Sequence, residues 1–213
     1  MEKSRRLSFV TMVTKDELYQ ENVISSTYVN RNDIEYITVK NSKSGASGLN
    51  SGVEKATNNI VVCCHQDVFF ENGWYEKLNK CLDKLNDITK YRLWGILGFA
   101  GTTYDGKMVG THSGLGMTDN MDIIPVQTLD ESVLIIKKSD NFKFDEGLIY
   151  YHMYGTDITL QSHSKDLNVY VLNVPIDHRT KWTSGNGFGE SVTYIQKKWH
   201  SKYNVIYTTI GTL

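Results

Sequence analysis

The sequence predicts an α/β fold built on a central, mostly parallel sheet with flanking helices. Three short apolar runs rich in β-branched residues, at 7–13, 34–39 and 59–64, are each followed by a segment with helical spacing. Alternation of this kind is typical of parallel sheets, because two parallel strands need a crossover connection that a helix can supply. We therefore expect one domain spanning 1–213.

The first two strands lead into polar segments that become helical. After the first strand, Asp16 offers an N-cap to a helix that includes Val23. After the second strand, a polar Gly/Ser-rich loop at 41–48 precedes a helix on which Leu49 and Val53 fall at helical spacing. Both units therefore repeat the strand-helix order.

The third strand ends in polar residues. The run 59–64 is apolar enough to be a central strand, and His65-Gln66-Asp67 follows it. In an open α/β sheet, ligands bind beyond the carboxyl ends of the strands. A carboxylate there needs a cation or hydrogen bonds to offset its burial. For Asp67 taken alone, a cap of its own turn is the commoner interpretation.

Beyond residue 93 the pattern becomes irregular and interrupted by glycine. Further elements are expected as apolar pieces at 94–99 and 104–110, a strand at 133–136, a helix around Asp157, a strand at 169–174, and a last helix with Phe188, Val192, Ile195 and Trp199 on its apolar stripe. Irregular halves of this kind often carry binding residues.

The composition excludes some classes of function. Lys and Arg number 23 against 24 Asp and Glu, and a net charge of -1 supplies no field for binding nucleic acid. The three cysteines, with Cys63 and Cys64 adjacent in an apolar run, indicate reduced, buried thiols in a cytoplasmic protein. The N-terminal apolar stretch is too short for a spanning helix, so we expect no transmembrane segment and at most peripheral membrane contact.

Several short motifs occur along the chain, and their order is far more specific than any one of them. They are Asn50 with Gly52 and Ala56, His65-Gln66-Asp67-Val68, Phe144-Asp145-Glu146, Tyr154-Gly155-Thr156-Asp157, and Pro175-Ile176-Asp177-His178. This series, from about 8 to 178, resembles the family-2-like glycosyltransferases of the GT-A fold, and most closely a small branch with His-Gln-Asp as its metal motif. The resemblance implies a Rossmann-like nucleotide-binding half at about 1–100. It also implies a small, irregular acceptor-side half with a C-terminal helix at 101–213.

The resemblance also implies a nucleotide-sugar donor, with a UDP-sugar favoured, and a glycan or lipid-linked acceptor. The donor-binding residues it implies are Val10, Thr11, Thr14, Asn41, Ser42, Asn50, His65 and Gln66. Asp67 and His178 are expected to hold Mn²⁺ or Mg²⁺ at the donor phosphates. His65 stands where the usual motif has its first carboxylate, which lowers the negative charge there. A hydrogen-bonded structural histidine is the alternative for His178.

Asp157 aligns with the family's catalytic carboxylate, with Thr156 in place of the usual Glu. Inverting sugar transfer needs a base that takes the proton of the acceptor hydroxyl, and the resemblance gives this role to Asp157. An ordinary helix N-cap is the alternative. Asp130 and Glu131 occupy the position of acceptor-facing carboxylates, for which solvated strand-end charges are the alternative.

Two other functions compete with glycosyl transfer. A catalytically silent sugar-binding module that has kept the fold is compatible with the histidine at position 65. A nucleotidyltransferase would share an α/β nucleotide site, but residues 10–15 lack the glycines of the phosphate loop that such enzymes usually carry.

Overall fold

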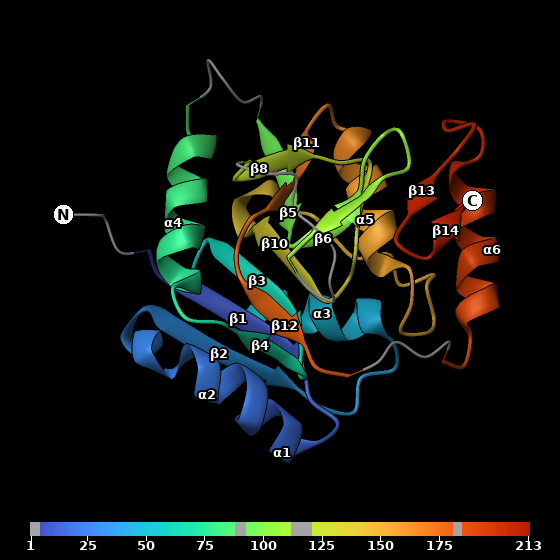
Figure 1. Ribbon diagram of the computed structural model, residues 1–213. Helices are drawn as coiled ribbons and strands as arrows, with labels where there is room; N and C mark the ends of the chain where they lie inside the picture. The colour runs from blue at the N-terminus through green and yellow to red at the C-terminus, as the bar shows by residue number, and fades with distance from the viewer. Residues whose placement is uncertain (1–4, 88–92, 112–120, 181–184) are drawn as a thin grey trace.

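The computed structural model describes residues 5–87, 93–111, 121–180 and 185–213, and for 29–31 the backbone alone. Its centre is a seven-stranded sheet with the order β2-β1-β3-β10-β5-β11-β8 (Figure 1). In chain order these strands are β1 (Leu7–Met12), β2 (Ile34–Val39), β3 (Ile60–His65), β5 (Trp94–Gly98), β8 (Ile123–Pro125), β10 (Val133–Lys137) and β11 (Asn168–Leu172).

The strand directions confirm the prediction of a mostly parallel sheet. β1 pairs in parallel with both β2 and β3, and β5 pairs in parallel with β11. β10 lies antiparallel between β3 and β5, and β8 is antiparallel at the edge. β1, β2, β3, β5 and β11 therefore point the same way. The carboxyl ends of β1, β2 and β3 meet at one edge, where the predicted polar segments begin.

Helices cover both faces of the sheet, because alternate strand residues point to opposite sides. One face packs against α3 (Gly45–Lys55), α5 (Tyr154–His163) and α6 (Phe188–Trp199), and its core includes Val10 and Leu134. The other face packs against α4 (Trp74–Leu85) and the helical segment formed by α1 (Asp16–Tyr19), η1 (Gln20–Ile24), α2 (Ser25–Thr27) and η2 (Tyr28–Asp33). Phe9 lies in this second core. In Figure 1, α4 and α6 lie on opposite sides of the molecule.

The second helix begins earlier than its apolar residues predict. α3 starts at Gly45 because Ser44 and Ser47 form a capping box, in which the Ser44 hydroxyl accepts a 3.2 Å hydrogen bond from the Ser47 amide. Part of the predicted loop is therefore helical. Gly52 lets α3 approach the sheet closely, since a Cβ there would lie 2.2 Å from Cγ1 of Val10.

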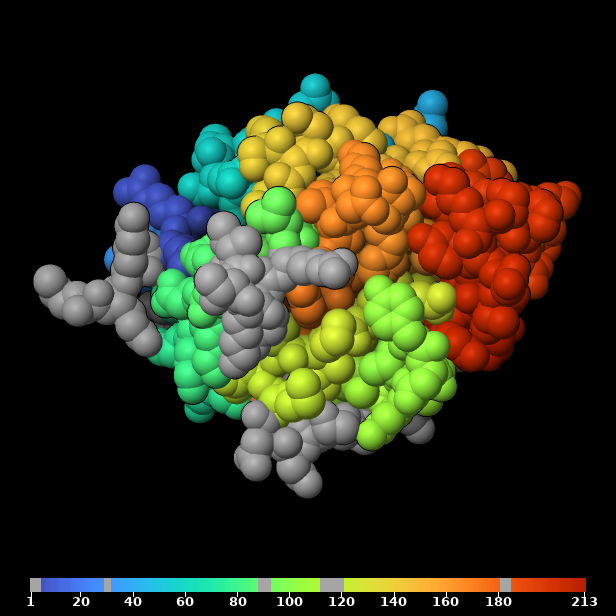
Figure 2. Space-filling model, turned by 90° about the horizontal axis from the view of Figure 1, so that it is seen from above, coloured from blue at the N-terminus to red at the C-terminus, as the bar shows by residue number. Residues whose placement is uncertain are grey.

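Apart from β4, the short strands outside the central sheet lie in the irregular half. They are the antiparallel pair β4 (Val68–Phe70) and β12 (Ile176–His178), the small sheet β7 (Met108–Gly110), β6 (Ala100–Thr102) and β9 (Thr128–Leu129), and the hairpin β13 (Tyr207–Thr208) and β14 (Gly211–Thr212). A short 3₁₀ turn, η3 (Lys138–Asp140), follows β10. Figure 2 shows the C-terminal segment, in red, against the orange and yellow segments that precede it.

Two further expectations concern thiols and membranes. Cys63, Cys64 and Cys81 are free and buried, as their apolar surroundings predict. Among the described residues, no helix has the length and apolar character needed to cross a bilayer.

Candidate functional site

Three residues that are distant in the sequence form a potential metal site at the end of β3. His65 closes β3, Asp67 follows in the turn, and the pairing of β12 with β4 places His178 opposite Val68. One ligand atom from each of His65, Asp67 and His178 lies within 4.8 Å of the others. The structure thus brings together both predicted metal ligands and the histidine of the His-Gln-Asp step.

Hydrogen bonds keep the Asp67 carboxylate charged although the side chain is largely buried. Burial raises the pKa of Asp67, but hydrogen bonds from His178 and Thr180 outweigh it and hold the pKa below its usual range. Nε2 of His178 lies 3.3 Å from Oδ1 of Asp67, and the Thr180 hydroxyl donates to Oδ2. Burial alone would lower the pKa of His178. The hydrogen bond with Asp67 and the charge of Asp67 outweigh burial and raise this pKa above its usual value.

A buried tyrosine from α5 contacts the first histidine. Nε2 of His65 lies 2.7 Å from the hydroxyl of Tyr154. Burial raises the pKa of Tyr154 well above its ordinary value, so the hydroxyl stays protonated at neutral pH. Such a partner fixes the orientation of an imidazole ligand. The sequence pattern gave no sign of this contact, because Tyr154 is 89 residues from His65.

The donor set of the cluster fits a divalent transition metal better than Mg²⁺. Two imidazoles and one carboxylate are nitrogen-rich, whereas Mg²⁺ is usually bound through oxygen and water. A divalent ion there would also offset the buried Asp67 charge.

The cluster lies in a cleft of about 220 Å³ that six parts of the chain enclose. The lining residues are His65, Asp67, Leu129, Asp130, Glu131, Tyr151, His152, Thr156, His178, Thr180, Phe188, Thr208, Thr209 and Ile210. The predicted acceptor-facing carboxylates Asp130 and Glu131 therefore share one cleft with the potential metal ligands.

A second pocket of about 230 Å³ lies at the ends of β1 and β2. Its lining includes the predicted donor-binding residues Thr14, Asn41 and Ser42. Asn41 has a positive φ of 56°, a backbone conformation that asparagine tolerates. Tyr151 lines both this pocket and the cleft that holds His65, Asp67 and His178, and its hydroxyl donates to the Ser42 carbonyl. The two cavities therefore adjoin at Tyr151, which the sequence pattern did not single out.

Three other predicted donor-binding residues belong to β1 or follow β3 without lining either pocket. Val10 and Thr11 are fully buried, and the Thr11 hydroxyl lies 3.1 Å from Sγ of Cys64. Gln66 joins the ends of β1 and β3, because its Oε1 accepts hydrogen bonds of 2.9 and 3.0 Å from the amides of Thr14 and Lys15. The side chains of these residues line neither pocket.

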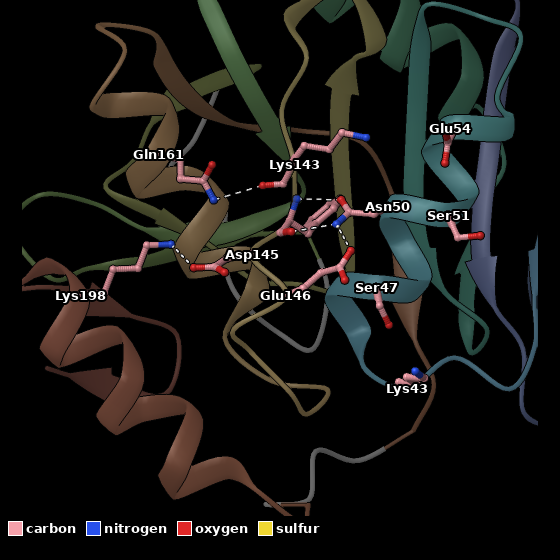
Figure 3. A pocket seen from close by; sticks show the side chains of 11 residues that line it. Lys43, Ser47, Asn50, Ser51, Glu54, Lys143, Asp145, Glu146, Gln161 and Lys198 are labelled. Atoms are coloured by element: carbon pink, nitrogen blue, oxygen red, sulfur yellow. Dashed lines mark hydrogen bonds and ion pairs between the residues drawn. The ribbon is translucent and has the colours of Figure 1, made fainter.

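Asn50 lies in a separate surface groove of about 910 Å³ that shares no lining residue with the cleft (Figure 3). Its amide donates to the Phe144 carbonyl at 2.9 Å and to Glu146 at 3.0 Å, and its Oδ1 accepts from the Phe144 amide. Asn50 thus fastens α3 to the segment before α5. The structure does not bring it to the pocket expected for the donor.

Asp157 faces away from the cleft. It is 0% exposed, its Oδ1 lies 2.7 Å from Nε1 of Trp199 and 2.8 Å from Nζ of Lys198, and its Oδ2 accepts from Gln161. Its neighbour Thr156 lines the cleft instead, since adjacent helical residues point about 100° apart. The structure therefore places Asp157 between α5 and α6 rather than beside Asp67.

The two carboxylates before β10 differ in their partners. Asp130 accepts from the Ser132 amide at 2.8 Å and from the Thr209 hydroxyl at 3.4 Å. Glu131 accepts from the Gly155 amide at 3.4 Å, and its Oε1 lies 4.0 Å from Nδ1 of His152. Burial, followed by the nearby Asp130 charge, raises the pKa of Glu131 to about 8.

Solved structures with similar folds support this architecture. The fragment 1–349 of TarS from S. aureus matches with a TM-score of 0.57 and 13% identity, over 92% of this chain and 65% of the fragment. GalNAc-T7 with UDP, GalNAc and Mn²⁺ matches with a TM-score of 0.63 and 11% identity, over 96% of this chain and 50% of that protein. At these identities the likeness shows the fold alone, and the chain spans only part of either protein.

The sheet order and the likeness to these two structures show a fold of the GT-A type. A sequence model of the glycosyltransferase-like family matches residues 8–203. The chain belongs to this glycosyltransferase-like family, as the order of its motifs predicts. A comparison with curated proteins found no significant match.

Proposed function

We propose that this chain transfers a sugar from a nucleotide-sugar donor to a hydroxyl acceptor, with metal assistance and inversion at the anomeric carbon. The observation that carries the proposal is the junction of two cavities at Tyr151. One lies where strand ends offer backbone groups to a nucleoside, and the other contains the His65-Asp67-His178 cluster. A donor diphosphate would extend from the first cavity into the second.

Thr14, Asn41 and Ser42 would contact the nucleoside, and Tyr151 would lie beside the diphosphate. His65, Asp67 and His178 would hold a divalent ion, with Mn²⁺ favoured over Mg²⁺ by the two imidazoles. When bound, the ion neutralises charge on the departing nucleoside diphosphate. UDP is the favoured nucleotide, because a structure with this fold contains UDP and Mn²⁺.

Side chains of the protein would hold the metal position and bind the acceptor. Asp67 stays ionised through its bonds to His178 and Thr180, so no proton competes for the metal position at neutral pH. The acceptor, a glycan or lipid-linked hydroxyl, would enter beside Asp130 and Glu131. Asp157 would position α6 against α5 and have no part in the chemistry.

Calorimetry tests the donor site directly. UDP, GDP, CDP and dTDP are titrated into the protein with and without Mn²⁺, and we expect Mn²⁺-dependent binding of one of them. Asp67→Asn should weaken that binding more than tenfold, as expected when a carboxylate ligand is lost. Asp166→Asn is the matched control, since Asp166 is exposed, has a φ of 57° that asparagine also tolerates, and lines neither cavity.

A donor screen tests transfer itself. The protein is incubated with nucleotide-sugars, glycan acceptors and Mn²⁺, and products are identified by mass spectrometry. Transfer with an inverted anomeric centre supports the proposal. Nucleotide binding with neither transfer nor donor hydrolysis would favour a silent module, and pyrophosphate release from a nucleoside triphosphate and a sugar phosphate would favour a nucleotidyltransferase.

A further inference from the structure

The lining of the metal cleft includes three carboxylates: Asp67, Asp130 and Glu131. Asp67 is bonded to His178 and Thr180 within the metal cluster. Asp130 closes its own turn through a 2.8 Å hydrogen bond from the Ser132 amide. Glu131 faces the cleft at the start of α5, where it accepts from the Gly155 amide at 3.4 Å, lies beside the Met153 and Tyr154 amides, and has its Oε1 4.0 Å from Nδ1 of His152.

Glu131 occupies the space beside the first turn of α5. A Cβ built on Gly155 would lie 3.0 Å from Cβ, 3.1 Å from Cα and 3.2 Å from the amide nitrogen of Glu131. A side chain at 155 would therefore compete with Glu131 for one volume. Glu131, in the segment before β10, thus places a carboxylate at the N-terminus of α5. The free amides of the first helical turn favour a negative charge at that position.

We propose that Glu131, and not Asp157, is the general base for the acceptor hydroxyl. The inference rests on the proposed function. An oxygen of Glu131 accepts the hydroxyl proton while the acceptor oxygen bonds to the anomeric carbon. The bond from that carbon to the donor phosphate oxygen breaks, and its electron pair leaves with the nucleoside diphosphate. The proton ends on Glu131, so charge and atoms balance.

The surroundings of Glu131 suit this task. A general base works best when its pKa lies near the working pH, and burial with the Asp130 charge brings the pKa of Glu131 to about 8. The other groups that face it are the imidazole of His152, the Tyr154 phenol on α5 and the first amides of that helix. Burial lowers the pKa of His152, so this neighbour is neutral at pH 7 and above.

The test compares Glu131→Gln with Asp157→Asn in the full chain, using the donor and acceptor from the screen. We expect Glu131→Gln to lower kcat by about 10²- to 10⁴-fold, the usual contribution of a general base, with an unchanged KM for the donor. Mn²⁺-dependent UDP binding, measured by calorimetry, should stay as in the wild type. Glu54→Gln is the matched control and should keep full activity, because Glu54 lies in the separate surface groove that also contains Asn50 (Figure 3).

The remaining outcomes separate the two proposals. If Glu131→Gln turns over as fast as the wild type while Asp157→Asn is folded and inactive, Glu131 is not the base, although the transferase function stands. Asp130→Asn, tested beside it, would reveal the neighbouring carboxylate as the base if it alone abolished kcat. If the wild type neither binds a nucleotide nor turns over any donor, the proposed function and this inference both fail.

Discussion

The indole Nε1 of Trp199 donates a 2.7 Å hydrogen bond to Oδ1 of the fully buried Asp157. The same oxygen lies 2.8 Å from Nζ of Lys198, which also pairs with Asp145. These contacts join α6 to α5 and to the segment before α5. In this fold, the residue that the family resemblance assigns to catalysis links two helices through its side chain.

Asp157→Asn should accordingly destabilise the protein. Loss of the ion pair with Lys198 and a weaker acceptor for Trp199 should lower the free energy of unfolding by about 1–3 kcal/mol. Urea denaturation measures this change, and kcat per folded molecule should remain near the wild-type value. A variant of unaltered stability that had lost turnover would argue for a catalytic Asp157 instead.

Tyr154→Phe should weaken metal binding without disturbing the core. The phenyl ring keeps the packing, but the 2.7 Å contact to Nε2 of His65 is lost. Removal of a partner that orients a metal ligand typically lowers metal affinity by about 10- to 100-fold. Mn²⁺ titration in the presence of UDP measures the effect, with Tyr203→Phe as the control. Equal affinities in the two variants would show that Tyr154 does not orient His65.

Gly155→Ala should lower activity by displacing Glu131. The alanine Cβ would lie 3.0 Å from Cβ, 3.1 Å from Cα and 3.2 Å from the amide nitrogen of Glu131, so the backbone at Glu131 must shift. We expect kcat per folded molecule to fall and the thermal midpoint to fall with it, because the preference of a helix for alanine over glycine, about 1 kcal/mol, does not relieve a contact with backbone atoms. Full activity in this variant would mean that the position of Glu131 does not matter for turnover.

Glu131→Gln should also change how stability depends on pH. The pKa of Glu131 rises from about 4.5 to about 8 on folding, so between these values the folded state binds more protons than the unfolded state. Wild-type stability should therefore lose a contribution as pH rises through this window, and the Gln variant should not. Between wild type and Glu131→Gln, the difference in the free energy of unfolding should grow to about 1–3 kcal/mol as pH rises. Each pKa unit corresponds to about 1.4 kcal/mol, and the partial exposure of the Glu131 side chain reduces the full effect.

Urea denaturation of metal-free protein at pH 5, 7 and 9 measures this difference. Glu54→Gln, at an exposed position, should parallel the wild type at each pH. Parallel curves for wild type and Glu131→Gln would instead mean that Glu131 titrates normally.

The sequence by itself determined the class of fold and part of the site. Periodicity placed β1, β2, β3 and α6 closely, because burial selects apolar residues at the spacing of each element. The resemblance predicts that Asp67 and His178 share one metal site, and in the structure Nε2 of His178 lies 3.3 Å from Oδ1 of Asp67. The strands β4 and β12 were not predicted, since each has only three residues and is defined by its pairing.

Only the tertiary structure decided which carboxylate faces the cleft. Thr156 and Asp157 are adjacent in sequence, yet one lines the cleft and the other lies against α6, because the rotation of α5 sets their directions. Glu131 reaches the start of α5 because Gly155 leaves room for it. Motif order cannot encode such a choice, since it depends on the packing of segments that are far apart in the chain.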